Sequence, residues 1–271
     1  MISRIHFISG LPRSGSTLLS ALLRQNPCFW AGISSPLAAA CRQLHHQMSN
    51  GEFSVFFDEG RRVDMLRGLF DSYYIKESRD RVIFDTNRTW TGRVPLLTAL
   101  YPRCKIICCV REVGWILDSL ERLRAKNPLH VSKIFTAENS VTVYTRAESL
   151  MNADRGLIGQ AWSTLREAWF SEHADRLIII PYESLVQRPE RTLRKLYEEL
   201  GETPFEHDFN HVSYEEPDYD ALLGTPGLHT VRPVVAHEER ELAIPPDLRA
   251  KYANTSFWSK PELNPRAVRI L

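Results

Sequence analysis

The sequence predicts an α/β protein, in which a parallel sheet carries helices on both faces within a single domain. Apolar strand patterns alternate with amphipathic helix patterns along the chain, as expected where helices connect parallel strands. With 271 residues, of which 43% are hydrophobic, the chain is long enough to fill one large core. No internal repeat or low-complexity segment divides it. We therefore expect one domain over residues 1–271.

The N-terminal part of the chain predicts a strand, a helix and a second strand. Residues 4–9 read as a buried strand, and residues 17–24 have the apolar spacing of a helix that stops before Pro27. Residues 81–84 are a short apolar run that ends at Asp85. These elements supply the first strand–helix alternation.

The middle of the chain continues the alternation. Residues 94–101 form a helix that Pro102 closes. Residues 105–110 are apolar throughout, as in a strand buried on both faces, and residues 114–123 form an amphipathic helix after it. A polar strand end therefore lies at residues 111 and 112.

The later elements complete the predicted sheet. Ile158, Trp162, Leu165 and Trp169 follow helical spacing, so the two tryptophans are expected in the core. Residues 177–180 form a last clear strand. A helix over residues 189–200 follows, with proline at its start and glycine just past its end.

The overall charge is close to neutral. The 34 basic residues nearly cancel the 33 acidic residues, so the chain has no general field for nucleic acid, and any anion site is local. No apolar run of about 18 residues predicts a transmembrane segment, and the N-terminus lacks the pattern of a signal peptide. We expect a cytoplasmic protein without a nucleic-acid partner.

The five cysteines predict reduced thiols. Three of them, Cys104, Cys108 and Cys109, lie in or beside one apolar strand. Successive strand residues point to opposite faces, so Cys108 and Cys109 are poorly placed to share a metal ion. No other His, Cys or carboxylate cluster predicts a metal site.

The loop between the first strand and the first helix is the main chemical signal. Gly10 and Gly15 have the spacing of a P-loop, whose backbone N–H groups and helix N-terminus bind phosphate. Ser16 stands where the P-loop lysine belongs, and the cation is Arg13, inside the loop. A nucleoside triphosphatase needs that lysine, so the loop favours a shorter phosphate chain. The predicted fold is thus P-loop-like.

Residues 10–18 resemble the 5′-phosphosulfate-binding loop of sulfotransferases that use 3′-phosphoadenylyl sulfate (PAPS). The form is closer to the tyrosylprotein and bacterial branches than to the cytosolic branch, which has lysine at the Arg13 position. The resemblance implies that the cofactor contacts lie at Pro12, Arg13, Ser14, Gly15, Ser16 and Thr17.

A second pair of polar residues follows the buried strand. Arg111 stands at the carboxyl end of that strand, and Ser119 is eight residues further along the next helix. Ligands of open α/β sheets bind off these strand ends, which predicts that Arg111 and Arg13 lie on one rim. In the sulfotransferase family this spacing binds the 3′-phosphate of PAPS. Glu112 replaces the usual aspartate.

Two further stretches match the family. Residues 180–185 resemble a segment in which tyrosine lies near the nucleotide, which implies a cofactor contact by Tyr182, although packing at a strand end is an alternative. The C-terminal loop near residues 213–237 is rich in turn formers. By resemblance it closes over the cofactor, and Arg232 contacts a phosphate or the sulfuryl group.

The resemblance implies in-line transfer of the sulfuryl group to an acceptor hydroxyl or amine, without a metal. Arg13 would stabilise the charge that develops on the bridging oxygen. The residues that serve as base in the family are absent, so the candidates are Asp85 at a strand end, then Glu148 and His229. Each of them also has a structural interpretation, such as capping or pairing.

Two other functions stay open from the sequence. One is a P-loop nucleotide kinase or nucleotidase, and the other is a non-catalytic nucleotide-binding relative that has lost the base. The acceptor class is open as well: a small molecule, a saccharide, a lipid or a peptide. We expect mobile insertions near residues 50–62 and 127–152 to select it.

Overall fold

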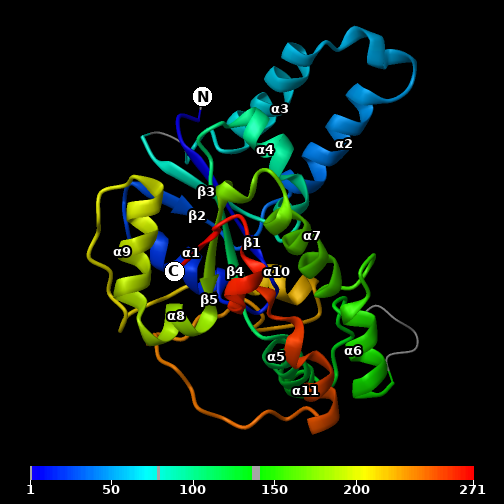
Figure 1. The fold of residues 1–271 in the computed structure, drawn as a ribbon, viewed down its shortest axis with the longest axis vertical. Helices are drawn as coiled ribbons and strands as arrows, with labels where there is room; N and C mark the ends of the chain where they lie inside the picture. The colour runs from blue at the N-terminus through cyan, green and yellow to red at the C-terminus, as the bar shows by residue number, and fades with distance from the viewer. Residues whose placement is uncertain (1, 78–79, 136–140) are drawn as a thin grey trace.

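A six-stranded parallel sheet organises the chain (Figure 1). The computed structural model describes residues 2–77, 80–135 and 141–271. The strands are ordered β2-β3-β1-β4-β5-β6, and each adjacent pair is parallel. Their bounds are β1 (Ile5–Gly10), β2 (Phe29–Ala31), β3 (Val82–Thr86), β4 (Ile106–Val110), β5 (Leu177–Pro181) and β6 (Arg269–Ile270).

Helices cover both faces of the sheet, as the sequence predicts. Those described are α1 (Ser16–Leu23), α2 (Leu37–Ser49), α3 (Glu59–Tyr73), α4 (Val94–Leu100), α5 (Val113–Lys126), α6 (Val143–Met151), α7 (Gly159–Phe170), α8 (Tyr182–Gln187), α9 (Pro189–Leu200), α10 (Pro217–Leu222) and α11 (Pro246–Tyr252). The single-domain α/β architecture is confirmed.

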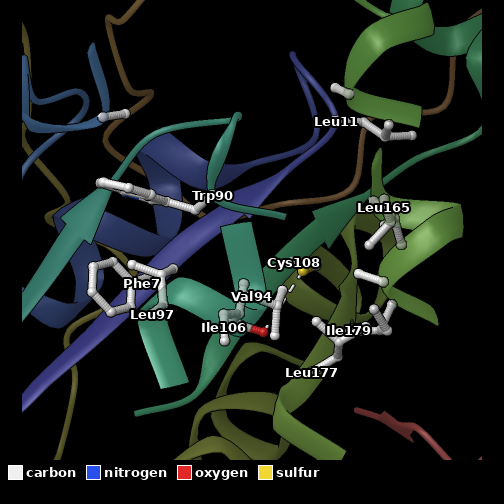
Figure 2. Packing of buried hydrophobic residues seen from close by; sticks show 14 of the residues in the cluster. Phe7, Leu11, Trp90, Val94, Leu97, Ile106, Cys108, Leu165, Leu177 and Ile179 are labelled. Carbon is white, nitrogen blue, oxygen red and sulfur yellow. Dashed lines mark hydrogen bonds between the residues drawn. The ribbon is translucent and has the colours of Figure 1, made fainter. Parts of the chain in front are cut away.

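Alternation along the strands separates two buried clusters, one on each face. The larger cluster contains Phe7, Cys108 and Leu165, and Figure 2 shows these side chains among their neighbours from β4, β5 and α4. The smaller cluster contains Ile8 and Cys109 and packs beneath α1 and α9. Cys108 and Cys109 therefore face opposite sides of β4, as predicted, and both are free thiols.

The segment between β2 and β3 is more helical than the sequence predicts. Helices α2 and α3 project from the sheet side by side, and the turn between them contains a short 3-10 helix, Glu52–Phe56 (Figure 1). The expected insertion at 50–62 is the tip of this hairpin. Only Leu66 and Phe70 are buried on α3. This narrow apolar stripe explains why the sequence pattern is weak.

The expected insertion at 127–152 also contains a helix, α6, while residues 136–140 lie outside the described part of the chain. Thr142 Oγ1 accepts a hydrogen bond from Thr145 N at 3.2 Å, and Thr145 Oγ1 accepts one from Thr142 N at 3.2 Å. Reciprocal capping thus starts the helix without the glutamate that usually signals it. Among the described helices, none is long and apolar enough to cross a membrane.

Candidate active site

A cavity of about 1050 Å³ opens at the carboxyl ends of the strands. The segments that follow β1, β3, β4 and β5 line it, and residues 219–240 of the C-terminal part close one side. This is the edge where open α/β sheets bind ligands. The cavity brings together segments that the sequence predicts separately.

The loop after β1 is built for close approach of the backbone. Gly10 has φ +101°, and a Cβ there would lie 2.2 Å from the carbonyl oxygen of Cys109. Gly15 has φ +92° and precedes α1 as its N-cap residue without a side-chain cap. Leu11 N donates to Cys109 O at 2.8 Å, which ties the loop to β4. The N-terminus of α1 therefore presents its positive end to the cavity.

Arg13 occupies the centre of this loop in the left-handed conformation, with φ +57°. Its Nε donates to Ser119 Oγ at 3.1 Å, and its Nη1 donates to the carbonyl oxygen of Leu228. Burial lowers the pKa of the Arg13 guanidinium, and the positive charge of Arg111 lowers it further. Arg13 is thus a partly desolvated cation next to a second cation.

The other predicted loop residues differ in whether they line the cavity. Pro12, Gly15, Ser16 and Thr17 line it. Ser14 is buried instead, and its hydroxyl donates to the carbonyl oxygen of Pro12 at 3.3 Å. Its side chain therefore shapes the loop, whereas the prediction placed Ser14 among the phosphate contacts.

Arg111 lies at the end of β4 in a cradle of aromatic rings. Its Cζ is 3.9 Å from the centroid of the Tyr182 ring and 5.4 Å from that of Trp115. Its buried Nε has no hydrogen-bond partner among the described residues; the Glu183 carboxylate oxygen is 3.9 Å away. Burial lowers the pKa of Arg111. A fixed, buried donor without an acceptor is suited to an incoming anion.

Tyr182 supports both the cation and the loop. Besides stacking on Arg111, its Cδ2 would lie 3.0 Å from a Cβ at Gly15. The ring therefore packs against the glycine at the N-terminus of α1. Tyr182 also lines the cavity, where the prediction placed it.

The C-terminal loop lies along the cavity, held by backbone bonds. Val212 N donates to Pro233 O at 2.8 Å, and Val231 N donates to Tyr214 O at 3.0 Å. Arg232 lines the cavity, largely exposed, and its guanidinium is 2.8 Å from the Glu238 carboxylate. The predicted closing loop and the predicted cation thus lie at the cavity wall.

A buried carboxylate fixes the next part of this segment. Asp118, one residue before Ser119, accepts from Ala243 N at 2.6 Å and from the guanidinium of Arg240. The Cζ of Arg240 is 5.2 Å from the Trp115 ring centroid. Sequence reasoning missed Asp118, Trp115 and Arg240. The signal for Trp115 and Asp118 was their position on α5, the helix that also carries Ser119; Arg240 lies in the C-terminal segment, which offers no such signal.

Asp85, the first candidate base, lies in the core. It is fully buried on the same face of β3 as Ile83, and its carboxylate accepts from Tyr74 Oη and Trp90 Nε1, each at 2.6 Å. Burial raises the pKa of Asp85. Its neighbour Thr86 lines the cavity, but Asp85 is not among the described lining residues. Strand alternation points its carboxylate into the larger buried cluster, where Tyr74 and Trp90 bind it, so this geometry supports a structural role.

Glu148, the second candidate, lies on α6 with an exposed side chain. Its carboxylate accepts a hydrogen bond from Lys251 Nζ at 3.0 Å. Glu148 is not among the described residues that line the cavity. This placement gives it no route to an acceptor proton.

His229, the third candidate, lines the cavity and has a built-in partner. Its Nδ1 is 2.5 Å from Asp220 Oδ1, and its backbone N donates to Asp220 Oδ2 at 2.8 Å. Asp220 is buried, and a carboxylate only accepts, so Nδ1 carries the proton and Nε2 keeps its lone pair. Burial lowers the pKa of His229, against the opposing effect of Asp220. Sequence reasoning missed Asp220, because it lies in the short helix α10, which the sequence did not predict.

Residues 6–207 match the sequence model of the sulfotransferase family. The chain belongs to that family. It is 26% identical over 219 residues to the nodulation protein NoeE of Sinorhizobium fredii, a match that covers 74% of this chain and 50% of that protein. The chain therefore spans about half the length of that curated relative.

Solved sulfotransferase structures share the fold. The mouse sulfotransferase SULT7A1 complexed with PAP superposes with a TM-score of 0.54 at 15% identity, covering 98% of this chain and 87% of that one. The sulfotransferase domain from the curacin biosynthetic pathway gives 0.53 at 16% identity, covering 94% and 92%. The fold of this chain is thus shared with solved sulfotransferases.

Proposed function

We propose that this protein transfers a sulfuryl group from PAPS to an acceptor hydroxyl or amine and releases adenosine 3′,5′-bisphosphate. The observation that carries the proposal is the hydrogen bond from Arg13 to Ser119. This contact joins the loop of residues 10–17 to Ser119, which supports the binding of both ends of one donor there. Family membership and the PAP complex of the mouse relative support the same donor.

The residues present fit this donor. The uncapped N-terminus of α1 and the Arg13 guanidinium suit the 5′ phosphosulfate. The unpartnered Nε of Arg111 and the Ser119 hydroxyl suit the 3′-phosphate. Tyr182 offers a ring beside them, and Arg232 adds a cation on the C-terminal loop. When bound, PAPS supplies the sulfuryl group and a phosphate leaving group.

The transition-state charge is met by Arg13 and the α1 N-terminus. As the sulfur–oxygen bond to the phosphate breaks, negative charge grows on the oxygen that leaves, and these groups stabilise it without rearrangement. Arg13 keeps further N–H donors besides those that bond to Ser119 and Leu228, so it can contact the donor and the C-terminal loop together.

His229 is the base that the geometry favours. Its Nε2 takes the proton of the acceptor hydroxyl as the new sulfur–oxygen bond forms, and the buried Asp220 stabilises the resulting imidazolium. The lowered pKa of His229 keeps the ring neutral at pH 7. The acceptor oxygen thus gives its proton to His229 as it gains the sulfuryl group, and adenosine 3′,5′-bisphosphate is the leaving group.

Calorimetry tests the donor assignment. Adenosine 3′,5′-bisphosphate should bind in EDTA and more tightly than ADP, because only the former carries a 3′-phosphate. Arg111→Ala should abolish that preference, whereas Arg103→Ala, which removes an exposed arginine outside the cavity lining, should retain it. Equal binding of ADP, or of ATP with Mg²⁺, by the native protein contradicts the proposal and returns the nucleotide kinase to consideration.

A turnover assay separates the enzyme from a non-catalytic relative. PAPS and a mixture of hydroxyl and amine acceptors are incubated with the protein, and the sulfated products are detected by mass. Products that depend on Arg13 support the proposal. Release of bisphosphate without any sulfated acceptor, or no consumption of PAPS at all, counts against it.

A further inference from the structure

The cavity extends beyond the part that suits the donor. In the sheet, β1 lies between β4 and β3. The donor residues follow β1, β4 and β5, so they occupy one side of Arg13. On the other side, the chain leaves β3 through Thr86 and Arg88, which also line the cavity. This second half is the space beside His229 that remains for an acceptor.

Three cations on the segments after β3, after α5 and before α7 line the cavity: Arg88, Lys133 and Arg155. Lys126, at the end of α5, is a fourth cation in the lining. No hydrogen bond or ion pair joins their side chains to another residue in the described part of the chain. Arg232 and Arg240, by contrast, each pair with a carboxylate. Among the described lining residues the one carboxylate is Glu238, and Arg232 holds it.

Hydrogen bonds and close packing of the backbone fix the segments that carry these three cations. Arg88 O accepts from Ser9 Oγ at 3.0 Å, which anchors the turn after β3 to β1. Lys133 N donates to Leu223 O at 3.0 Å, at a place where a Cβ on Gly224 would lie 2.3 Å from Val131 O. These segments are far apart in sequence, yet each delivers a cation to the same cavity.

Arg155 reaches the cavity from a tight turn between α6 and α7. Its backbone N donates to Asn152 Oδ1 at 2.9 Å, and a Cβ on Gly156 would lie 2.4 Å from Leu150 O. Helix α7 is joined to the segment after β3 by the Thr91 and Thr164 hydroxyls, which are 2.9 Å apart. The turn that carries Arg155 is therefore fixed relative to the segment that carries Arg88.

The positive charges of Arg88, Lys133 and Arg155 favour the binding of an anion. All three are exposed residues at the cavity, and desolvation by the surrounding walls lowers the pKa of Arg88. Like charges in such a cavity repel one another, and the walls focus the resulting positive potential onto whatever enters. The phosphosulfate and 3′-phosphate of the donor are assigned to Arg13 and Arg111, so they leave these cations free. An acidic group on the acceptor would meet these cations, which the donor does not use.

We propose that the acceptor carries an acidic group, a carboxylate or a phosphate, that Arg88, Lys133 and Arg155 bind while its hydroxyl lies at Arg13 and His229. The proposal rests on the proposed sulfuryl transfer and adds the substrate class. Apolar side chains of Ile134, Leu157 and Leu223 also line the cavity. They suit a ring or short chain between the hydroxyl and the acidic group.

Ligand-observed NMR on the protein saturated with adenosine 3′,5′-bisphosphate tests this class. The probes are two matched pairs: 4-hydroxyphenylacetate with its neutral amide, and glucose 6-phosphate with glucose. At least one acidic member should bind about 10-fold more tightly than its neutral partner, a difference typical of one good charge-assisted contact. Added salt should weaken the acidic probe more than the neutral one. The two pairs separate carboxylate from phosphate recognition.

The double variant Arg88→Gln/Arg155→Gln should remove the advantage of the acidic probe. Arg103→Gln is the matched control and should retain it, and thermal unfolding checks that both variants are folded. Equal binding within both pairs, no binding by either acidic probe, or an advantage that survives in the double variant overturns the inference. Failure of the bisphosphate itself to bind is a separate outcome, which overturns the donor assignment.

Discussion

Arg13 and Ser119 are 106 residues apart in sequence, and the Nε of Arg13 donates to the Ser119 hydroxyl at 3.1 Å. The same guanidinium donates to the carbonyl oxygen of Leu228. The Arg13 side chain, which belongs to the loop after β1, therefore contacts both α5, through Ser119, and the C-terminal loop, through Leu228. Because these segments meet at a cation, a ligand with two anionic groups can replace internal contacts with stronger ones.

Replacing Arg13 should separate binding from turnover. Arg13→Ala is expected to lower turnover by about 10²–10³, as for other preorganised electrostatic contacts, because the charge it stabilises is largest in the transition state. The affinity for bisphosphate should fall much less. Steady-state kinetics and calorimetry measure the two effects.

Arg13→Lys is the conservative control. It keeps the charge and should retain much of the activity, although it loses the planar contact to Ser119. If Arg13→Ala weakens product affinity as much as turnover, Arg13 is a binding residue only.

The protonation of His229, which is hydrogen-bonded to Asp220, should determine how kcat/KM falls at acid pH. A base has to be neutral, so kcat/KM should fall as the pH drops through the pKa of His229, which lies below its ordinary 6.5 because burial lowers it. His229→Gln should lower kcat by about 10²–10⁴ and remove this acid limb. Bisphosphate affinity provides the control for folding of the site.

Asp220→Asn addresses the orientation of the ring. The amide is nearly the same size but can offer an N–H to His229 Nδ1, which favours the wrong tautomer, so kcat should fall while KM changes little. A full loss of folding would be seen by thermal unfolding. An unchanged pH profile in His229→Gln would exclude this histidine as the base.

Much of the donor side was predictable from short-range pattern. The loop of residues 10–17 joins a strand to a helix, and Arg111 stands at the end of a fully buried strand, so topology alone puts both on one rim. The spacing of Arg111 and Ser119 within one segment is local as well. The inward direction of the Ser14 side chain could not be predicted, because a motif names residue types without saying which side chains are buried.

The acceptor side was not predictable, because long-range packing builds it. Asp85 looked like a rim residue, yet the alternation of β3 turns it toward Tyr74 and Trp90, partners from two other segments. His229 looked like an ordinary loop histidine until α10 placed Asp220 beside it. Arg88, Lys133 and Arg155 show no common pattern in the chain and meet only in the fold.

Asp85→Asn should therefore be a stability variant. The amide can accept only one of the two buried donors with its oxygen and brings an N–H that needs a partner, so the free energy of unfolding should fall by about 1–3 kcal/mol. Urea unfolding measures the change. The pH profile of the remaining activity should match that of the native protein, and loss of its acid limb would instead restore Asp85 as the base.

His6 should make the fold sensitive to mild acid. This buried residue of β1 accepts a hydrogen bond at Nδ1 from Lys105 N at 3.1 Å. Burial, together with the smaller effects of the positive charges of Arg4 and Lys105, lowers the pKa of His6 from 6.5 to about 4. The folded state thus favours the neutral ring. Its contribution is complete above pH 6.5 and is lost as the pH falls toward 4.

Between pH 7.5 and pH 5 this one group should therefore lower the free energy of unfolding by about 2 kcal/mol, since protonation is possible only in the unfolded chain over most of that range. Urea unfolding at the two pH values measures the loss. His6→Gln should reduce the loss by about that amount, because glutamine does not titrate, even if the variant is less stable at both pH values. His130→Gln changes an exposed histidine and should leave the pH dependence as it is. Equal pH dependence in His6→Gln and the native protein would mean that other groups, such as His207, whose pKa burial also lowers to about 4, account for the acid sensitivity.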